Sequence, residues 1–141
     1  MNYLQAFAIS ASGMAVEKAR VDLTAVNIAN AQSTRSADGV GVRPMRLVSA
    51  AKGGDFESLL GNSVPLRGAE IVSVAALTTP PRLVYEPGHP DADEKGFVAY
   101  PGINPIAEMV NLLTAVRAYE ANVAALNAAK SMALRTLNLG S

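Results

Sequence analysis

Residues 104–139 read NPIAEMVNLLTAVRAYEANVAALNAAKSMALRTLNL, with no Gly or Pro after Pro105. Asn104 followed by Pro105 is a typical helix start, because Asn caps free backbone N–H groups and Pro fits the first helical position. Glu108 suits the positive end of the helix dipole, and Gly140 supplies a stop. The stretch therefore predicts a helix of roughly 50 Å at 1.5 Å per residue. Such a helix is too long for the core of a 141-residue globule.

Within this helix, side chains recur at alternating steps of three and four, as in a heptad repeat. This predicted seam consists of Met109, Leu112, Val116, Tyr119, Val123, Leu126, Lys130, Ala133 and Leu137. Residues 1–33 predict a second helix, whose seam consists of Phe7, Ala11, Met14, Lys18, Val21, Ala25 and Ile28. We therefore expect the two terminal helices to pair as a parallel or antiparallel coiled coil.

The charged residues are distributed unevenly along the chain. Of its 12 acidic and 12 basic residues, only four lie in 1–33 and five in 104–141. The outer face of a two-helix coil in water should be charged, whereas here it is rich in Ala, Ser, Asn, Thr and Leu. We infer that other subunits bury these helices. In the isolated chain we expect them to be disordered or loosely helical, because alone they bury too little surface to offset their ordering entropy.

The middle region, residues 34–103, contains Gly and Pro punctuation between short β-prone runs. The predicted strands are Val40–Val48, Glu70–Leu77, Arg82–Tyr85 and Gly96–Tyr100. The last two flank a long loop at 86–95 and predict a hairpin, and Asp55–Leu60 predicts a short helix. The expected fold class is therefore α+β, organised as an N-terminal helix (1–33), a β-rich middle region (34–103) and a C-terminal helix (104–141).

Composition excludes several function classes. The formal net charge is zero, which argues against binding to nucleic acid or an acidic membrane surface. There is no Cys and only one His, His89, so thiolate and His-rich metal sites are excluded. Asp91 and Asp93 resemble the start of a calcium loop, but Lys95 and Gly102 occupy positions that need oxygen ligands. The start of the chain resembles neither a signal peptide nor a membrane span. We predict no enzyme activity, no cofactor, no metal site and no membrane insertion.

Three motifs resemble the axial proteins of bacterial flagella, the family that forms the rod, hook and hook-associated segments. Residues 21–31, VDLTAVNIANA, resemble the family's N-terminal motif, with its paired Asn27 and Asn30. The YEPGHPDAD run at 85–93, followed by GFVAYP at 96–101, resembles the central block of the proximal rod members. Ala118–Val123, with Asn127 and the Ala129–Lys130 pair, is similar to the C-terminal signature. Gly102 departs from the pattern, since the family usually has Asn there.

The resemblance implies a structural subunit whose terminal helices form a coiled-coil-like, D0-type core with a small β-region outside. It further implies export by the flagellar type III apparatus and helical assembly in the basal-body rod, which spans the periplasm and transmits torque. The implied partners are other copies of the chain, other proximal rod proteins, the adapter between rod and MS ring, and the distal rod protein. The alternatives are another axial component of rod or hook and a cytoplasmic helical-hairpin adaptor.

We expect subunit contacts at the terminal helices, from apolar seam residues and from neutral Asn side chains that avoid the cost of buried charge. The candidate interface residues are Phe7, Met14, Val21, Asn27, Ile28, Asn30, Met109, Leu112, Val116, Tyr119, Asn122, Val123, Leu126, Asn127 and Leu137.

Overall fold

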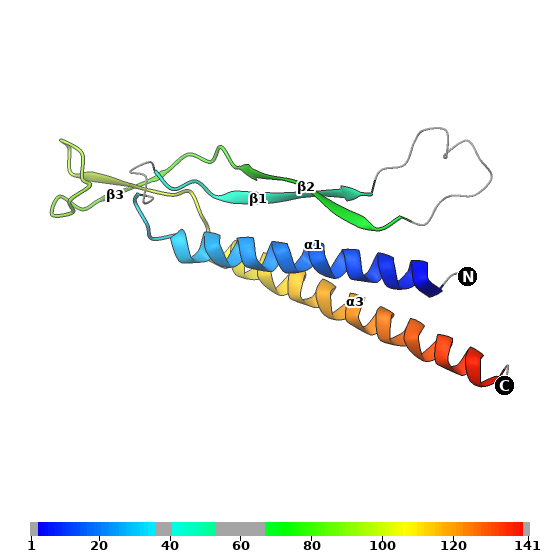
Figure 1. Cartoon of the computed structure of the whole chain (residues 1–141). Helices are drawn as coiled ribbons and strands as arrows, with labels where there is room; N and C mark the ends of the chain where they lie inside the picture. The colour runs from blue at the N-terminus through cyan, green and yellow to red at the C-terminus, as the bar shows by residue number, and fades with distance from the viewer. Residues whose placement is uncertain (1–2, 36–40, 53–66, 140–141) are drawn as a thin grey trace.

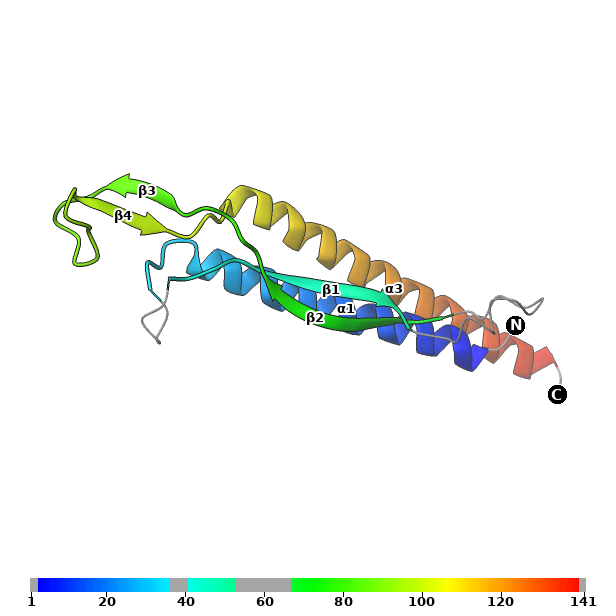
Figure 2. The same ribbon diagram turned by 90° about the horizontal axis from the view of Figure 1, so that it is seen from above.

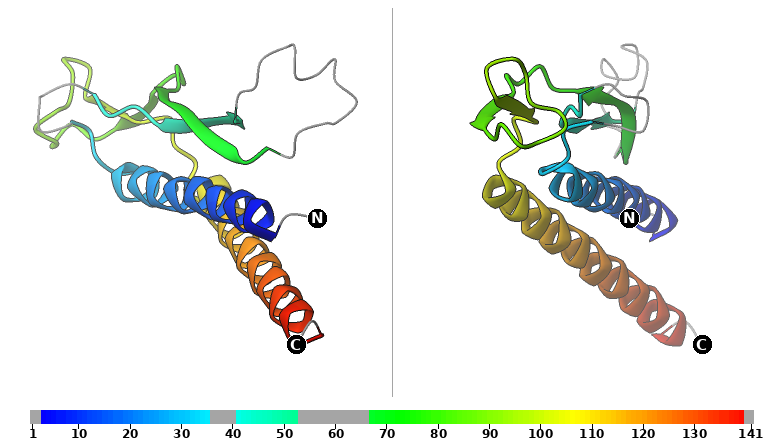
Figure 3. Two further views of the ribbon diagram at one scale, coloured as in Figure 1. Left: turned by 45° about the vertical axis from the view of Figure 1, so that its right-hand side comes forward. Right: turned by 90° about the vertical axis from the view of Figure 1, so that its left-hand side faces the viewer.

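The computed structural model describes residues 3–35, 41–52 and 67–139. Two long helices, α1 (Tyr3–Asn30) and α3 (Pro105–Leu139), lie side by side and run antiparallel (Figure 1). Figure 3 shows the same pair from two further directions, with the helices separating toward the chain termini. Both terminal helices were expected, and the open question of their relative direction is answered as antiparallel.

Four strands form two separate antiparallel sheets. β1 (Met45–Ala51) pairs with β2 (Ala69–Ala76) in a ribbon that follows α1, as Figure 2 shows from above. β3 (Arg82–Tyr85) pairs with β4 (Phe97–Tyr100) in a hairpin. The hairpin projects beyond the end of the helix pair at which α1 finishes and α3 starts. The α+β class is therefore confirmed, as two long helices with small antiparallel sheets.

The observed strand bounds differ from the predicted ones for local reasons. β1 begins at Met45 rather than Val40, after Pro44, which has no N–H for a strand ladder. The register shifts between Val48 and Ser49, which leaves Val72 as the extra residue of a β-bulge. β4 begins one residue after Gly96, whose φ of +81° belongs to a turn and not to a strand. The short helix predicted at 55–60 lies outside the described residues.

The start of α3 follows the predicted capping, whereas the stop predicted at Gly140 lies outside the described residues. Asn104 Oδ1 accepts hydrogen bonds from the backbone N–H groups of Ile106 (3.0 Å) and Ala107 (3.3 Å). After Asn30 the backbone turns, and the N–H of Ser33 donates to the Asn30 carbonyl at 3.0 Å. α1 is therefore slightly shorter than the 1–33 predicted from the sequence.

The chain has little interior. In the described part, the buried apolar side chains are Val16, Ala31, Pro44, Val98, Tyr100, Pro101, Ala115 and Ala129. Val98 of the hairpin is the largest fully buried side chain among them. Many large apolar side chains of the described residues are instead exposed, such as Leu4, Ile106 and Leu113.

Candidate assembly surface

Along the contact with α1, small and polar residues of α3 recur every seven positions. This row consists of Glu108, Ala115, Asn122, Ala129 and Thr136. At one end Glu108 accepts a hydrogen bond from Asn27 at 3.2 Å, and at the other Thr136 bonds the Tyr3 hydroxyl at 3.1 Å. Between them, Ala115 and Ala129 are buried. The row lies one residue before the predicted Met109, Val116, Val123, Lys130 and Leu137. The predicted Leu112, Leu126 and Ala133 follow members of the row by four residues and are half-buried.

On α1, three of the four buried residues are polar. The four are Ser10, Val16, Thr24 and Asn27. Gly13 lies against Asn122, and a Cβ at Gly13 would be 2.8 Å from Asn122 Oδ1. Asn122 is held there because its amide donates to the Ala118 carbonyl at 2.9 Å. At this level a glycine of α1 therefore lies directly against a polar side chain of α3.

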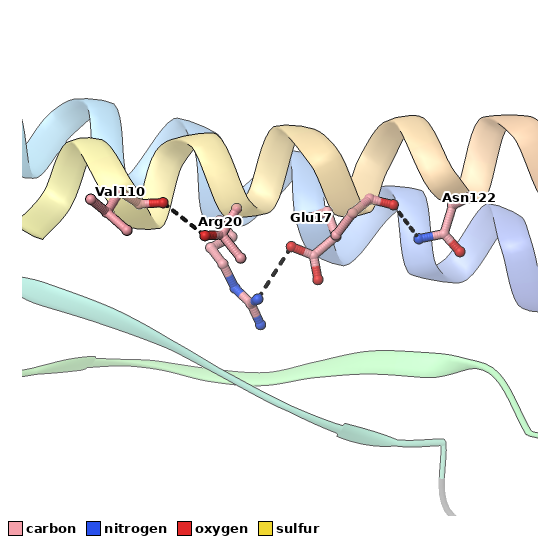
Figure 4. A network of polar contacts seen from close by, with 6 residues as sticks. Glu17, Arg20, Val110 and Asn122 are labelled. Atoms are coloured by element: carbon pink, nitrogen blue, oxygen red, sulfur yellow. Dashed lines mark hydrogen bonds and ion pairs between the residues drawn. The ribbon is translucent and has the colours of Figure 1, made fainter.

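Glu17 and Arg20 form an ion pair beside this contact. Glu17 Oε2 lies 3.2 Å from Arg20 Nη1, and Figure 4 shows the arginine extending from α1 toward the β1–β2 ribbon. Arg20 lines a groove of about 420 Å³ at the junction of both helices and the ribbon, together with Arg46, Leu47 and Glu108. The groove is open and polar, and we assign it no chemistry.

Asn27 connects three elements of the fold. Its amide nitrogen donates to the Met45 carbonyl (2.8 Å) and to Glu108 Oε2 (3.2 Å), while its oxygen accepts from the Met45 N–H (2.9 Å). The residue is only 4% exposed. These bonds fix the end of α1 against the start of β1 and the first turn of α3. Asn27 therefore has an intramolecular role, in addition to the subunit contact expected from sequence.

The hairpin loop is tied to the end of α1 through Asp91. One carboxylate oxygen accepts from Thr34 Oγ1 at 2.6 Å, and the other pairs with Arg35 Nε at 2.7 Å. Asp93 instead stabilises the loop itself, since its Oδ1 accepts from the N–H groups of Lys95 (2.9 Å) and Phe97 (2.8 Å). Both carboxylates that resembled a calcium loop thus have structural partners within the chain.

Tyr100 anchors the hairpin at its base. Its hydroxyl donates to Glu86 Oε2 at 2.9 Å, and the Arg82 guanidinium lies 5.6 Å from its ring centroid. The hydrogen bond to Glu86, with burial and the negative charge of that carboxylate, raises the pKa of Tyr100, while the charge of Arg82 opposes this. His89 packs edge-on against the ring, and its Nδ1 accepts from the Asp91 N–H.

The candidate interface residues fall into three groups by exposure. Asn27 is buried. The half-buried members are Phe7, Met14, Val21, Ile28, Asn30, Leu112, Val116, Asn122, Val123 and Leu126. The exposed members are Met109, Tyr119, Asn127 and Leu137. Whether any of them contacts another subunit stays a prediction.

Sequence reasoning did not identify Tyr3, Gly13, Glu108 and Thr136 as residues at which α1 and α3 contact each other. For Glu108 and Thr136 the signal was the seven-residue spacing of small and polar residues on α3, whereas no such spacing marks Tyr3 and Gly13. It also missed how much apolar surface faces outward: Leu4, Ile106, Val110, Leu113 and Leu134 each expose more than half of their area.

The described residues contain no cluster of three or more His, Asp or Glu side chains that could hold a metal ion. Over the same residues, none of the helices combines the length and apolar character of a membrane span.

Comparison with known proteins places the chain among flagellar proteins. The family model described as "Flagellar basal body rod FlgEFG protein C-terminal" matches residues 94–139, which include β4 and α3. The flagellar basal-body rod protein FlgC of Escherichia coli O157:H7 is 38% identical over 140 residues, covering 99% of both chains. FlgC of Bacillus subtilis (strain 168) is 33% identical, with 94% of both chains covered. FlgC of Aquifex aeolicus is 39% identical, with 96% of both covered.

Proposed function

Because this chain belongs to the family of the flagellar basal-body rod protein FlgC and is a structural subunit of that rod, we propose that it builds the proximal part. It is exported through the flagellar type III apparatus, assembles helically and transmits torque from motor to hook. The observation that carries this proposal is the distribution of side chains on the helix pair. Small and polar residues such as Gly13, Ala115 and Asn122 lie at or near the helix contact, while several large apolar residues of α3, such as Ile106, Val110 and Leu113, are exposed.

The exposed apolar side chains support assembly with neighbours. Leu4 on α1 and Ile106, Leu113 and Leu137 on α3 each expose more than half of their surface. A heterologous contact that does not close on itself generates an open helical array. Dense packing of helices in such an array would give the stiffness that torque transmission needs.

The seven-residue row on α3 supports a coiled-coil-like, D0-type core. A heptad spacing keeps one stripe of a helix against its partner over the whole length, and the contacts at Glu108, Asn122 and Thr136 follow that spacing. We accordingly divide the chain at the ends of the helices, into 1–33, 34–103 and 104–141. The first and last parts would form the core of the rod, and the middle part would lie outside it.

Rod proteins assemble with other components of the basal body, and this applies to the present chain. As specific partners we propose other copies, other proximal rod proteins, the adapter between rod and MS ring, and the distal rod protein. The candidate interface residues named from the sequence would make these contacts. The cytoplasmic adaptor is not pursued, since the relatives are rod proteins.

We propose that the subunit is not an enzyme and has no cofactor. This is supported by the structural use of its polar groups, since Asp91, Asp93 and His89 all bond within the hairpin region. The test is to isolate basal bodies from cells carrying an epitope-tagged copy and to locate the tag by electron microscopy. Tag density in the rod below its distal segment supports the proposal, and a purely cytoplasmic tag in flagellated cells contradicts it.

A further inference from the structure

The β3–β4 hairpin is joined to the rest of the fold through loops. Among the described helices and strands, β3 and β4 contact only each other. Figure 1 shows the hairpin extending beyond the end of the helix pair. We call residues 82–100, which include both strands and the loop between them, the hairpin arm. Because its strands have no partner in the helices or the ribbon, the direction of the arm depends on contacts that loops make.

The arm is well ordered within itself. Val98 is fully buried, and the Tyr100 hydroxyl donates to Glu86 Oε2 at 2.9 Å. Backbone bonds close the loop of the arm, since the Glu86 N–H donates to the Gly96 carbonyl at 2.9 Å. The His89 N–H donates in turn to the Glu86 carbonyl at 3.0 Å. The arm can therefore change its direction as one body without losing these bonds.

The two connections of the arm lie close together at its base. Gly102, which follows the arm, lies so near the Pro80 carbonyl that a Cβ at this glycine would overlap with it. Gly102 is also the residue at which the chain departs from the pattern of its family. Hinges are formed by a few residues at the ends of elements, and these are often small. The contact between Gly102 and Pro80 is therefore suited to be the hinge of the arm.

Asp91 ties the loop of the arm to the segment that follows α1. Its carboxylate accepts a hydrogen bond from Thr34 Oγ1 at 2.6 Å and pairs with Arg35 Nε at 2.7 Å. We call these three residues the clasp. The side chain of Asp91 is 20% exposed and that of Arg35 is 61% exposed. An ion pair that is open to solvent on one side stabilises a fold only modestly, so the clasp can open without unfolding the subunit.

His89 lies beside the clasp in the same loop. Its Nδ1 accepts a hydrogen bond from the Asp91 N–H at 3.1 Å, so this nitrogen carries no proton in the observed arrangement. The ring packs edge-on against Tyr100, with 6.4 Å between the centroids. The charged groups around His89 are Asp91 in its own loop, Arg35 after α1, and Glu86 and Arg82 across the Tyr100 ring.

Protonation of His89 would draw Asp91 out of the clasp. Histidine ordinarily gains its charge between about pH 8 and 5, a range in which aspartate stays ionised. A proton on His89 Nδ1 would face the Asp91 N–H, so two donors would meet and their hydrogen bond would be lost. The new N–H needs an acceptor, and the carboxylate of Asp91 offers one of opposite charge within the same turn. Asp91 can then no longer serve Thr34 and Arg35 as well.

We propose that Asp91, Thr34 and Arg35 form a pH-sensitive clasp that fixes the hairpin arm to the end of α1 and opens when His89 is protonated. With the clasp closed, the arm has one direction relative to the helix pair. With the clasp open, the arm turns about the contact between Gly102 and Pro80 and takes several directions. This inference goes beyond the proposed function, since it concerns motion within one subunit at any position in the rod.

Distances between two spin labels test the clasp. The chain has no Cys, so two introduced cysteines are labelled specifically. They replace Lys95 in the arm and Asp22 on α1, which are both exposed. The full-length labelled chain is incorporated into basal bodies as a small fraction among unlabelled copies, and pulsed EPR is recorded at about pH 7.5 and about pH 5. We expect one main distance at the higher pH, and other distances whose population rises at least threefold at the lower pH.

Three variants in the labelled chain assign the effect. Asp91→Asn should populate the other distances at both pH values, because Asn has no charge to pair with Arg35. His89→Asn should keep the main distance at both pH values, since its Oδ1 can accept from the Asp91 N–H and takes up no proton. Glu94→Gln is the matched control, because Glu94 is an exposed carboxylate in the same loop, and it should behave as the unchanged arm does.

Each contrary outcome overturns the proposal at a defined point. An unchanged set of distances at about pH 5 in the chain with native Asp91 and His89 would refute the pH sensitivity. A pH effect that persists in His89→Asn would refute the role of that histidine, and a single distance in Asp91→Asn would refute the clasp. A second pair of labels, at Asp22 and Arg117 on the two helices, should keep its distance. A change in that pair would place the effect in the helices and not in the arm.

Discussion

Replacing Asn27 by Ala tests the connection among α1, β1 and α3. The change removes three hydrogen bonds, two to the Met45 backbone and one to Glu108. Because Asn27 is 4% exposed, water does not readily replace them. Leaving buried groups unpaired costs about 1–3 kcal/mol for each, so a total of about 2–4 kcal/mol is expected after partial relaxation.

Hydrogen exchange of purified basal bodies measures this effect. The Met45 N–H bonds Asn27 Oδ1 at 2.9 Å, so its protection reports the contact directly. A loss of about 2–4 kcal/mol corresponds to exchange faster by about 30- to 1,000-fold, at 1.4 kcal/mol per factor of ten. Asn30→Ala is the control, because Asn30 is half-buried in the same motif and no contact described above uses its side chain. Unchanged exchange at Met45 in Asn27→Ala would refute the reasoning.

Three further changes test other parts of the account. Leu126→Asp should abolish rod assembly while leaving export intact, because a charge enters the half-buried helix surface. Secreted protein measures export and swimming measures assembly, and Ala124→Asp at an exposed position is the control. Gly96→Ala should destabilise the hairpin by about 1–2 kcal/mol, because the backbone φ of Gly96 is +81°, which disfavours a residue with a Cβ. Faster hydrogen exchange of the Phe97 amide would show this loss. Tyr100 has a raised pKa through its bond to Glu86, so folding favours the protonated phenol. The hairpin should therefore lose stability as the pH rises above about 10, and Tyr100→Phe should remove that loss.

The sequence predicted those elements whose signals are local. The cap at Asn104 and the uninterrupted run to Leu139 predicted α3 to within a residue. The Gly and Pro residues around 86–96 predicted the β3–β4 hairpin, because turn chemistry depends on neighbouring residues. Pro44 could have placed the start of β1, since it cannot donate to a ladder.

The facing sides of the helices could not be predicted from apolar periodicity alone. That method assigns the largest side chains to the contact, as at Met109 and Leu137, which are both exposed. Ala115 and Ala129 of α3 are buried instead, and alanines add little to an apolar pattern that is dominated by larger side chains. The link from Asn27 to Met45 spans 18 residues and depends on the crossing of three elements, for which no local pattern exists.

The central claim is that the terminal helices become stable only when neighbouring subunits cover them. Amide hydrogen exchange of α1 and α3, compared between the purified monomer at high dilution and the same chain in isolated basal bodies, tests it most directly. The account predicts exchange within about tenfold of the unfolded rate in the monomer, and protection at least 100-fold greater in the rod. Equal and strong protection of both helices in the dilute monomer would contradict it.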